Sequence, residues 1–211
     1  MTRAATATSL YQSVRRTPAL SLPVVGTALL LIDVINDLAF PGSGALVAQA
    51  EPMALRLAAL KLRVAAAGVP VIYVNDNFGK WQSDFGKLIT DCLEDDVRGR
   101  PLVQLLQPDP EDYFVLKPKH SGFFSTTLDT LLAYLHAKTL ILAGIAGNIC
   151  VLFTAHDAFM RDFHLIIPSD CVASNTPAEN RYALEHMRTV LQANIMPFSE
   201  IDWSKLRQRT D

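Results

Sequence analysis

The sequence lacks the features that mark several classes of protein. Its 211 residues hold only three cysteines, an odd number without framework spacing, which argues against a disulfide-stabilised secreted protein. No apolar run reaches the ~18 residues that a membrane-spanning helix needs. The net charge of −2, with both signs interspersed, leaves no basic patch for a phosphate backbone. We therefore expect a cytoplasmic protein that binds neither nucleic acid nor a membrane.

Acidic residues are also absent from the first 32 positions, which are rich in Ser, Thr and Ala and include Arg3, Arg15 and Arg16. Organelle transit peptides share this composition, but chain termini are often loosely held, and a flexible arm is the preferred interpretation. The length fits one domain. We expect an N-terminal arm at residues 1–26, one folded domain at 27–200 and a C-terminal tail at 201–211.

Short apolar runs alternate with longer amphipathic segments. The runs are continuously apolar, which is typical of strands covered on both faces. They lie at residues 28–33, 69–74, 113–116, 139–143, 164–168 and 194–198. This order predicts an α/β fold, a three-layer α/β/α sandwich with an open, mostly parallel, six-stranded sheet. Residues 78–110 read as a long excursion with a short helix or two, serving as a lid or an oligomer contact.

Two of the predicted helices begin with capping signals. Thr126 and Asp129 have the spacing of a capping box, and so do Thr176 and Glu179, with Pro177 in the first turn. The sequence predicts a helix start at each place.

Reactive side chains follow three of the predicted strands, and ligands of parallel sheets bind beyond the carboxyl ends of the strands. Asp33 ends the first run and Lys117 follows the third. Cys150 falls in the first turn of a helix after the fourth run, where the helix dipole favours a thiolate and backbone N–H groups can hold an oxyanion. Gly144 and Gly147 would let the backbone approach a ligand closely.

Other interpretations stay open for each of these residues. Asp33 could cap a loop, Lys117 could be a solvated surface lysine, and Cys150 could be an inert core residue. Cys171, which follows the fifth run, is the rival nucleophile. No two of the five histidines have metal-ligand spacing, and His120 could line the cleft, but Asp33 is the preferred base.

Three stretches resemble the isochorismatase-like cysteine hydrolases, a family that includes nicotinamidases and the carbamoylsarcosine and ureidoacrylate amidohydrolases. The stretches are residues 28–37, 117–123 and 144–151, and the resemblance extends over about residues 27–198. It implies a catalytic triad of Asp33, Lys117 and Cys150. It also implies a cis peptide bond between Ile145 and Ala146, and an oxyanion hole made by the N–H groups of Ala146 and Cys150.

The chain departs from the family pattern in several places. Ile35 and Gly122 replace a common Gln and Ala, which we interpret as changes in the pocket lining. Nicotinamidases bind a metal with Asp and His residues after the second strand, but here Asp76 and Asp84 stand without any histidine before His120. We predict no bound metal and no other cofactor, and a substrate other than nicotinamide.

The resemblance implies hydrolysis of a small, non-peptide C–N bond in an amide, ureido or carbamoyl compound, through a thioester. We expect a small-molecule substrate and a homo-oligomer, either a dimer or a tetramer. The candidate substrate-binding residues are Asn77, Phe78, Trp81 and Phe123. Two alternatives are vinyl-ether hydrolysis with Asp33 as the acid and a non-catalytic scaffold of the same fold, in which Cys150 would not react with iodoacetamide at neutral pH.

Overall fold

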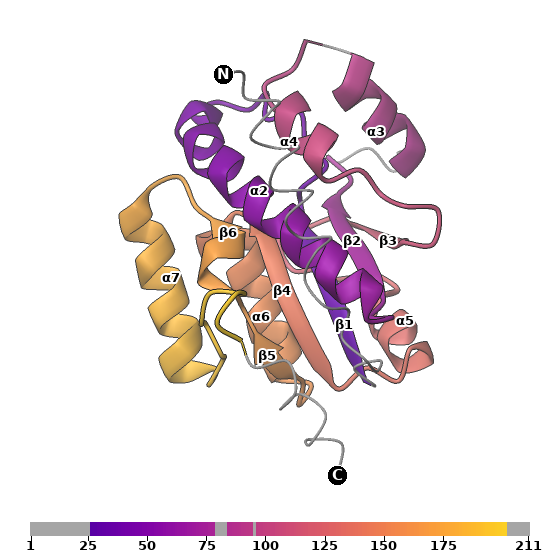
Figure 1. Cartoon of the computed structure of the whole chain (residues 1–211), viewed down its shortest axis with the longest axis vertical. Helices are drawn as coiled ribbons and strands as arrows, with labels where there is room; N and C mark the ends of the chain where they lie inside the picture. Colours follow the sequence, from indigo (N-terminus) through magenta and orange to yellow (C-terminus); the bar gives the residue numbers. More distant parts are fainter. Residues whose placement is uncertain (1–25, 79–83, 95, 202–211) are drawn as a thin grey trace.

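Within residues 26–78, 84–94 and 96–201, which the structure describes, six parallel strands form the sheet at the centre of the computed structural model (Figure 1). The strands are β1 (Thr27–Ile32), β2 (Val71–Asp76), β3 (Tyr113–Lys117), β4 (Thr139–Ile145), β5 (His164–Ile166) and β6 (Val172–Ala173). Their order is β3-β2-β1-β4-β5, and β6 pairs with β4. The predicted α/β class and the parallel sheet are therefore confirmed.

Helices cover both faces of the sheet, because successive side chains of a strand point to opposite faces. The helices are α2 (Ser43–Ala66), α3 (Phe85–Glu94), α4 (Arg100–Leu105), α5 (Leu128–Tyr134), α6 (Leu152–Phe159) and α7 (Pro177–Val190). In β1, Leu29 and Leu31 join the core beneath α2, α3 and α4, whereas Leu30 and Ile32 join the core beneath α5, α6 and α7. Figure 1 shows α2 lying across one face and α6 behind the other.

The predicted strand at residues 194–198 is wrong. Asn194 forms a single bridge with Ile166, and its side-chain oxygen then accepts the N–H of Met196, so a turn replaces further pairing. The sixth strand is instead the two-residue β6, which begins immediately after Cys171 and pairs with the end of β4.

The two predicted capping signals have different outcomes. Thr176 caps α7 as predicted: its hydroxyl accepts the N–H of Glu179, whose side chain accepts the N–H of Thr176 in return. The capping box at Thr126 is wrong, because the Thr126 hydroxyl donates to the carbonyl of Gly122 and Asp129 pairs with Arg161 at 3.0 Å. That helix, α5, begins at Leu128 without a side-chain cap.

The excursion at residues 78–110 contains two short helices, α3 and α4, as predicted. Both bury side chains in the core beneath α2, among them Cys92, Leu102 and Val103. Gly99 precedes α4 at a point where a Cβ atom would lie 1.7 Å from the carbonyl oxygen of Asn36, so only glycine allows this approach of the excursion to the loop after β1. Among the described residues, none of the helices has the length and apolarity that crossing a membrane requires.

Candidate active site

The structure brings together the three residues that the sequence placed at strand ends. Asp33 directly follows β1, Lys117 is the last residue of β3, and Cys150 lies in a π-helical turn (Gly147–Val151) between β4 and α6. The Lys117 Nζ atom lies 2.9 Å from Asp33 Oδ2 and 3.5 Å from Cys150 Sγ. A carboxylate, an ammonium group and a thiol therefore meet at the carboxyl edge of the sheet.

The turn that carries Cys150 is fixed by hydrogen bonds on both sides. The Ile145–Ala146 peptide bond is cis, as the resemblance implied. The Ala146 carbonyl accepts the N–H groups of Ile149 and Val151, and the Thr154 hydroxyl donates to the Cys150 carbonyl at 2.7 Å. The turn continues directly into α6, so the prediction that Cys150 begins a helix is confirmed.

The glycines around this turn are required by contacts within the protein. Gly144 has a φ of +119°, and a Cβ atom there would lie 2.2 Å from the carbonyl oxygen of Ile32 in the neighbouring strand. At Gly147 a Cβ atom would lie 2.6 Å from the side chains of Asn180 and Val172. Gly144 thus lets β4 pack closely against β1, and Gly147 lets the turn pack against β6 and α7.

Burial and charge set the proton affinities of the ion pair. Asp33 is 5% exposed and Lys117 is fully buried. Burial raises the pKa of Asp33 by more than the positive charge of Lys117 lowers it. Burial alone would lower the pKa of Lys117, but its interactions with its acidic neighbours, Asp33 above all, outweigh burial and the pKa is raised. Lys117 thus stays an ammonium, and Asp33 is a stronger base than an ordinary carboxylate.

The thiol of Cys150 is held in its protonated form. The pKa of Cys150 is raised to about 12, mainly by burial and secondly by the negative charge of Asp33. The positive charge of Lys117 offsets this increase only in part. The sequence-based expectation of a thiolate at the helix start is therefore wrong, because desolvation and a neighbouring carboxylate outweigh the dipole of one turn. A low reactivity toward iodoacetamide at neutral pH consequently no longer indicates a scaffold.

We predict that alkylation of Cys150 by iodoacetamide accelerates about tenfold per pH unit from pH 7 to pH 10 without levelling off, because a thiol of such high pKa is about one part in 10⁵ thiolate at pH 7. Mass spectrometry of the Cys150 peptide over time measures this rate. In the Asp33→Asn variant the carboxylate charge is lost, the pKa falls, and the rate at pH 8 should rise. A plateau below pH 8 in the wild-type protein would contradict the raised pKa.

Two further residues reach the site. Asp76, at the end of β2, lies 3.5 Å from Lys117 through its Oδ2 atom and donates its backbone N–H to Asp33. Asp33 was identified from the sequence as an acid at the end of an apolar strand. Asp76 shares this pattern, so the sequence could have identified it as well. His120 lies three residues beyond Lys117, and its Nδ1 atom is 3.8 Å from Cys150 Sγ.

The candidate substrate-binding residues lie in different surroundings. Asn77 is buried directly after β2, and its N–H donates to the Lys117 carbonyl. Phe78 is next and 42% exposed. Phe123 is 5% exposed and packs against Phe163 and Arg161, so we assign it no contact with substrate. Trp81 lies outside the described residues.

Ile35 and Gly122 do not line a pocket, contrary to their interpretation from the sequence. Ile35 is fully buried in the core beneath α2. A Cβ atom on Gly122 would lie 2.8 Å from Val74 and 3.2 Å from Leu128, in the other core. Both departures from the family pattern therefore concern packing beneath the helices.

The described residues contain no group of three or more His, Cys, Asp or Glu side chains that could hold a metal ion. Asp84 caps α3 through the N–H groups of Gly86 and Lys87, and Asp76 faces Lys117.

Cys171 is buried with its thiol 3.7 Å from Asp170, and burial raises its pKa. This environment makes Cys171 a poor rival nucleophile.

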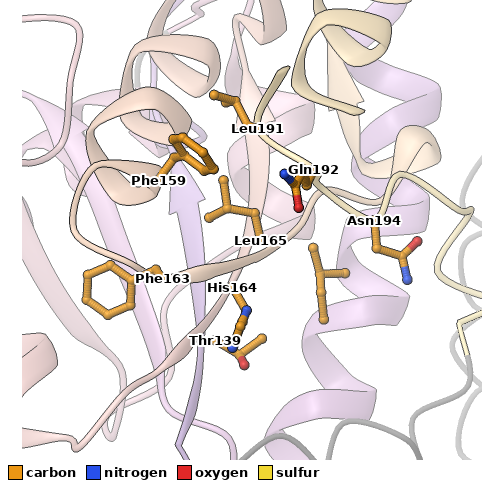
Figure 2. A pocket seen from close by; sticks show the side chains of 9 residues that line it. Thr139, Phe159, Phe163, His164, Leu165, Leu191, Gln192 and Asn194 are labelled. Atoms are coloured by element: carbon orange, nitrogen blue, oxygen red, sulfur yellow. The ribbon is translucent and has the colours of Figure 1, made fainter. Parts of the chain in front are cut away.

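A separate pocket of about 280 Å³ lies at the opposite end of the sheet (Figure 2). Thr139 and His164, which line it, are the first residues of β4 and β5, whereas Cys150 follows the far end of β4. Among its lining residues His164 is the one titratable side chain, and the others include Phe159, Leu165 and Leu191 (Figure 2). This pocket therefore offers neither a nucleophile nor a paired acid and base.

Known proteins resemble this chain over most of its length. The family model of the isochorismatase domain matches residues 27–196. The uncharacterized isochorismatase family protein YaaI of Bacillus subtilis is 41% identical over 174 residues, which are 82% of this chain and 95% of that protein. Ureidoacrylate amidohydrolase RutB of Methylobacterium radiotolerans is 28% identical, over 82% of this chain and 78% of its own length. The crystal structure of N-carbamoylsarcosine amidase from Thermoplasma acidophilum matches with a TM-score of 0.59 at 27% identity, covering 84% of this chain and 99% of that one.

Proposed function

Because this chain belongs to the isochorismatase family of hydrolases, we propose that it is a cysteine-dependent amidohydrolase that cleaves a small, non-peptide C–N bond through a thioester. One observation carries the proposal. The buried ammonium of Lys117 lies between the Asp33 carboxylate, at 2.9 Å, and the Cys150 sulfur, at 3.5 Å. A base, a cation and a nucleophile within hydrogen-bond reach are what covalent catalysis by a thiol requires.

In the proposed reaction the thiol loses its proton as it attacks. Cys150 forms a bond to the substrate carbonyl carbon while its proton passes to Asp33, whose raised pKa makes it a competent acceptor. The negative charge on the carbonyl oxygen is stabilised by the N–H groups of Ala146 and Cys150, and such donors are typically worth ~2.7–4 kcal/mol each. The C–N bond then breaks, and Asp33 gives its proton to the departing nitrogen. Water hydrolyses the thioester.

Lys117 acts by charge in this scheme. It remains an ammonium throughout, since the negative charge of Asp33 raises its pKa despite its burial. It therefore stabilises the thiolate character that develops on sulfur during attack and again when the thioester collapses. Asp76 is a second carboxylate near Lys117, at 3.5 Å, and adds to the negative charge that surrounds the ammonium.

Two similar proteins are named for their substrates, which are a ureido compound, ureidoacrylate, and a carbamoyl compound, N-carbamoylsarcosine. We propose that the substrate belongs to this class. We propose a substrate other than nicotinamide, because Asp76, the acid that a metal site after β2 would use, faces Lys117 at 3.5 Å.

The test is a screen for ammonia release from ureidoacrylate, N-carbamoylsarcosine and nicotinamide, with isochorismate assayed in parallel. We expect release from at least one ureido or carbamoyl compound, and none from the Cys150→Ala variant. Turnover of isochorismate that survives in Cys150→Ala would instead support vinyl-ether hydrolysis. A wild-type protein that neither turns over any of these compounds nor becomes acylated by an activated ester would support a scaffold.

A further inference from the structure

We propose that Thr154 and Asp157, two side chains of α6, are positioning residues that hold the 118–122 segment, which follows Lys117, at a fixed distance from the turn that carries Cys150. The inference rests on the proposed thioester mechanism, because it concerns the placement of the ammonium beside the sulfur. Both side chains act through the 118–122 segment, and neither needs to contact the substrate.

The 118–122 segment is in direct contact with the ammonium. Lys117 Nζ donates a hydrogen bond to the carbonyl oxygen of Lys119 at 3.1 Å. Lys117 is fully buried, so its charge depends on acceptors within the protein. A shift of the segment therefore moves one of the acceptors that hold the cation beside Cys150.

The Thr154 hydroxyl joins the far end of this segment to the nucleophile. Its Oγ1 atom accepts the N–H of Gly122 at 3.0 Å and donates to the carbonyl oxygen of Cys150 at 2.7 Å. A threonine inside a helix often donates to the carbonyl four residues earlier. The bond from Gly122 is additional, and it connects a distant part of the chain to the same hydroxyl. Thr154 is fully buried, so removal of its hydroxyl would leave both backbone groups without a partner.

Asp157, which lies one turn further along α6, holds the same segment through a second contact. Its Oδ2 atom accepts a hydrogen bond from the hydroxyl of Ser121, which is buried. Asp157 is itself held by Arg161, whose Nη1 atom lies 3.3 Å from Asp157 Oδ1. The helix that follows the nucleophile therefore holds two consecutive residues of the 118–122 segment.

The experiment measures the acylation of Cys150 by 4-nitrophenyl acetate. The acetyl group passes to Sγ, the thiol proton passes to Asp33, and coloured 4-nitrophenolate leaves. In Thr154→Val we expect the maximal acylation rate to fall at least about tenfold, because a misplacement of about 1 Å can cost about 10²-fold. The ester concentration that gives half the maximal rate should change by less than about threefold, since the lost bonds do not contact the ester.

Three further variants separate positioning from general stability, all assayed where circular dichroism shows them folded. Thr154→Ser keeps the hydroxyl and should retain the wild-type rate to within about threefold. Ser121→Ala breaks the contact with Asp157 and should slow acylation by about threefold or more, which tests the inference even if Thr154→Val does not fold. Thr27→Val is the matched control, because the buried Thr27 hydroxyl has no hydrogen-bond partner among the described residues. Its rate should stay within about twofold of the wild-type rate.

The outcomes distinguish this inference from the proposed function. A wild-type rate in Thr154→Val overturns the role of Thr154, and so does an equal loss in Thr154→Ser. A wild-type rate in Ser121→Ala overturns the role of Asp157. A wild-type protein that is not acylated, or that is acylated no faster than Cys150→Ala, overturns the thioester mechanism and the positioning roles with it.

Discussion

The Cys150→Ala variant is expected to lose at least about 10⁴-fold in turnover of the ureido or carbamoyl compound that the wild-type protein hydrolyses fastest, because no second group can form the thioester. Cys150→Ser should be nearly as inactive, since a hydroxyl is far harder to deprotonate than a thiol already held near pKa 12. Both variants should fold, as the sulfur lies at the partly exposed end of the turn. Ammonia release under saturating substrate measures the loss.

Cys171→Ala is the matched control for this prediction. Its thiol is buried beside Asp170, and the substitution should leave turnover within a few-fold of the wild-type value while lowering stability through the cavity it creates. Thermal unfolding should place the Cys150 variants within about 3 °C of the wild-type protein, a shift of at most about 1 kcal/mol for a chain of this size. Turnover that survives in Cys150→Ala and disappears in Cys171→Ala would reverse the assignment of the nucleophile.

The meeting of Asp33 and Lys117 was predictable because parallel strands share one carboxyl edge. In the observed register Ile32 lies opposite Val74 and Gly144, and Asp76 lies opposite Lys117. Residues that end these strands or directly follow them are therefore neighbours once the strand order is known. The strand order itself was not readable from periodicity, but the ends of β1 and β3 were readable to within one residue.

Other features of the site depend on contacts that no local pattern records. Burial and Asp33, a carboxylate distant in sequence, raise the pKa of the Cys150 thiol, whereas the dipole of the local helical turn would lower it. Gly144 is required by the carbonyl of Ile32 in the next strand, a contact that exists only after the sheet has formed. Likewise, Asp129 had the spacing of a capping residue, but Arg161 lies within reach and forms an ion pair with it.

Lys117→Met is expected to lower both stability and activity, because it leaves Asp33 buried without its cation. Removing one member of a buried ion pair typically costs ~3–5 kcal/mol of the free energy of unfolding. The loss should be largest at pH 8 and smaller at pH 5. Without Lys117 the pKa of Asp33, already raised by burial, rises further above its value in the unfolded chain. A carboxyl group of this kind stabilises the folded state when protonated, so the variant gains stability as pH falls.

Urea unfolding of three variants separates the effect of charge from that of packing. Lys119→Met removes an exposed lysine two residues away and should change the free energy of unfolding by less than about 0.5 kcal/mol. The double variant Asp33→Asn/Lys117→Met removes both charges and keeps an oxygen to accept the N–H of Asp76, so it should recover most of the lost stability and none of the activity. The double variant could instead be as unstable as Lys117→Met at pH 8. The loss of stability in Lys117→Met would then come from the lost packing and hydrogen bonds of the lysine side chain. An unpaired buried carboxylate would not be its cause. Recovery of stability without turnover would show that this ion pair is retained for the chemistry of Cys150, since an uncharged pair would hold the strand ends together equally well.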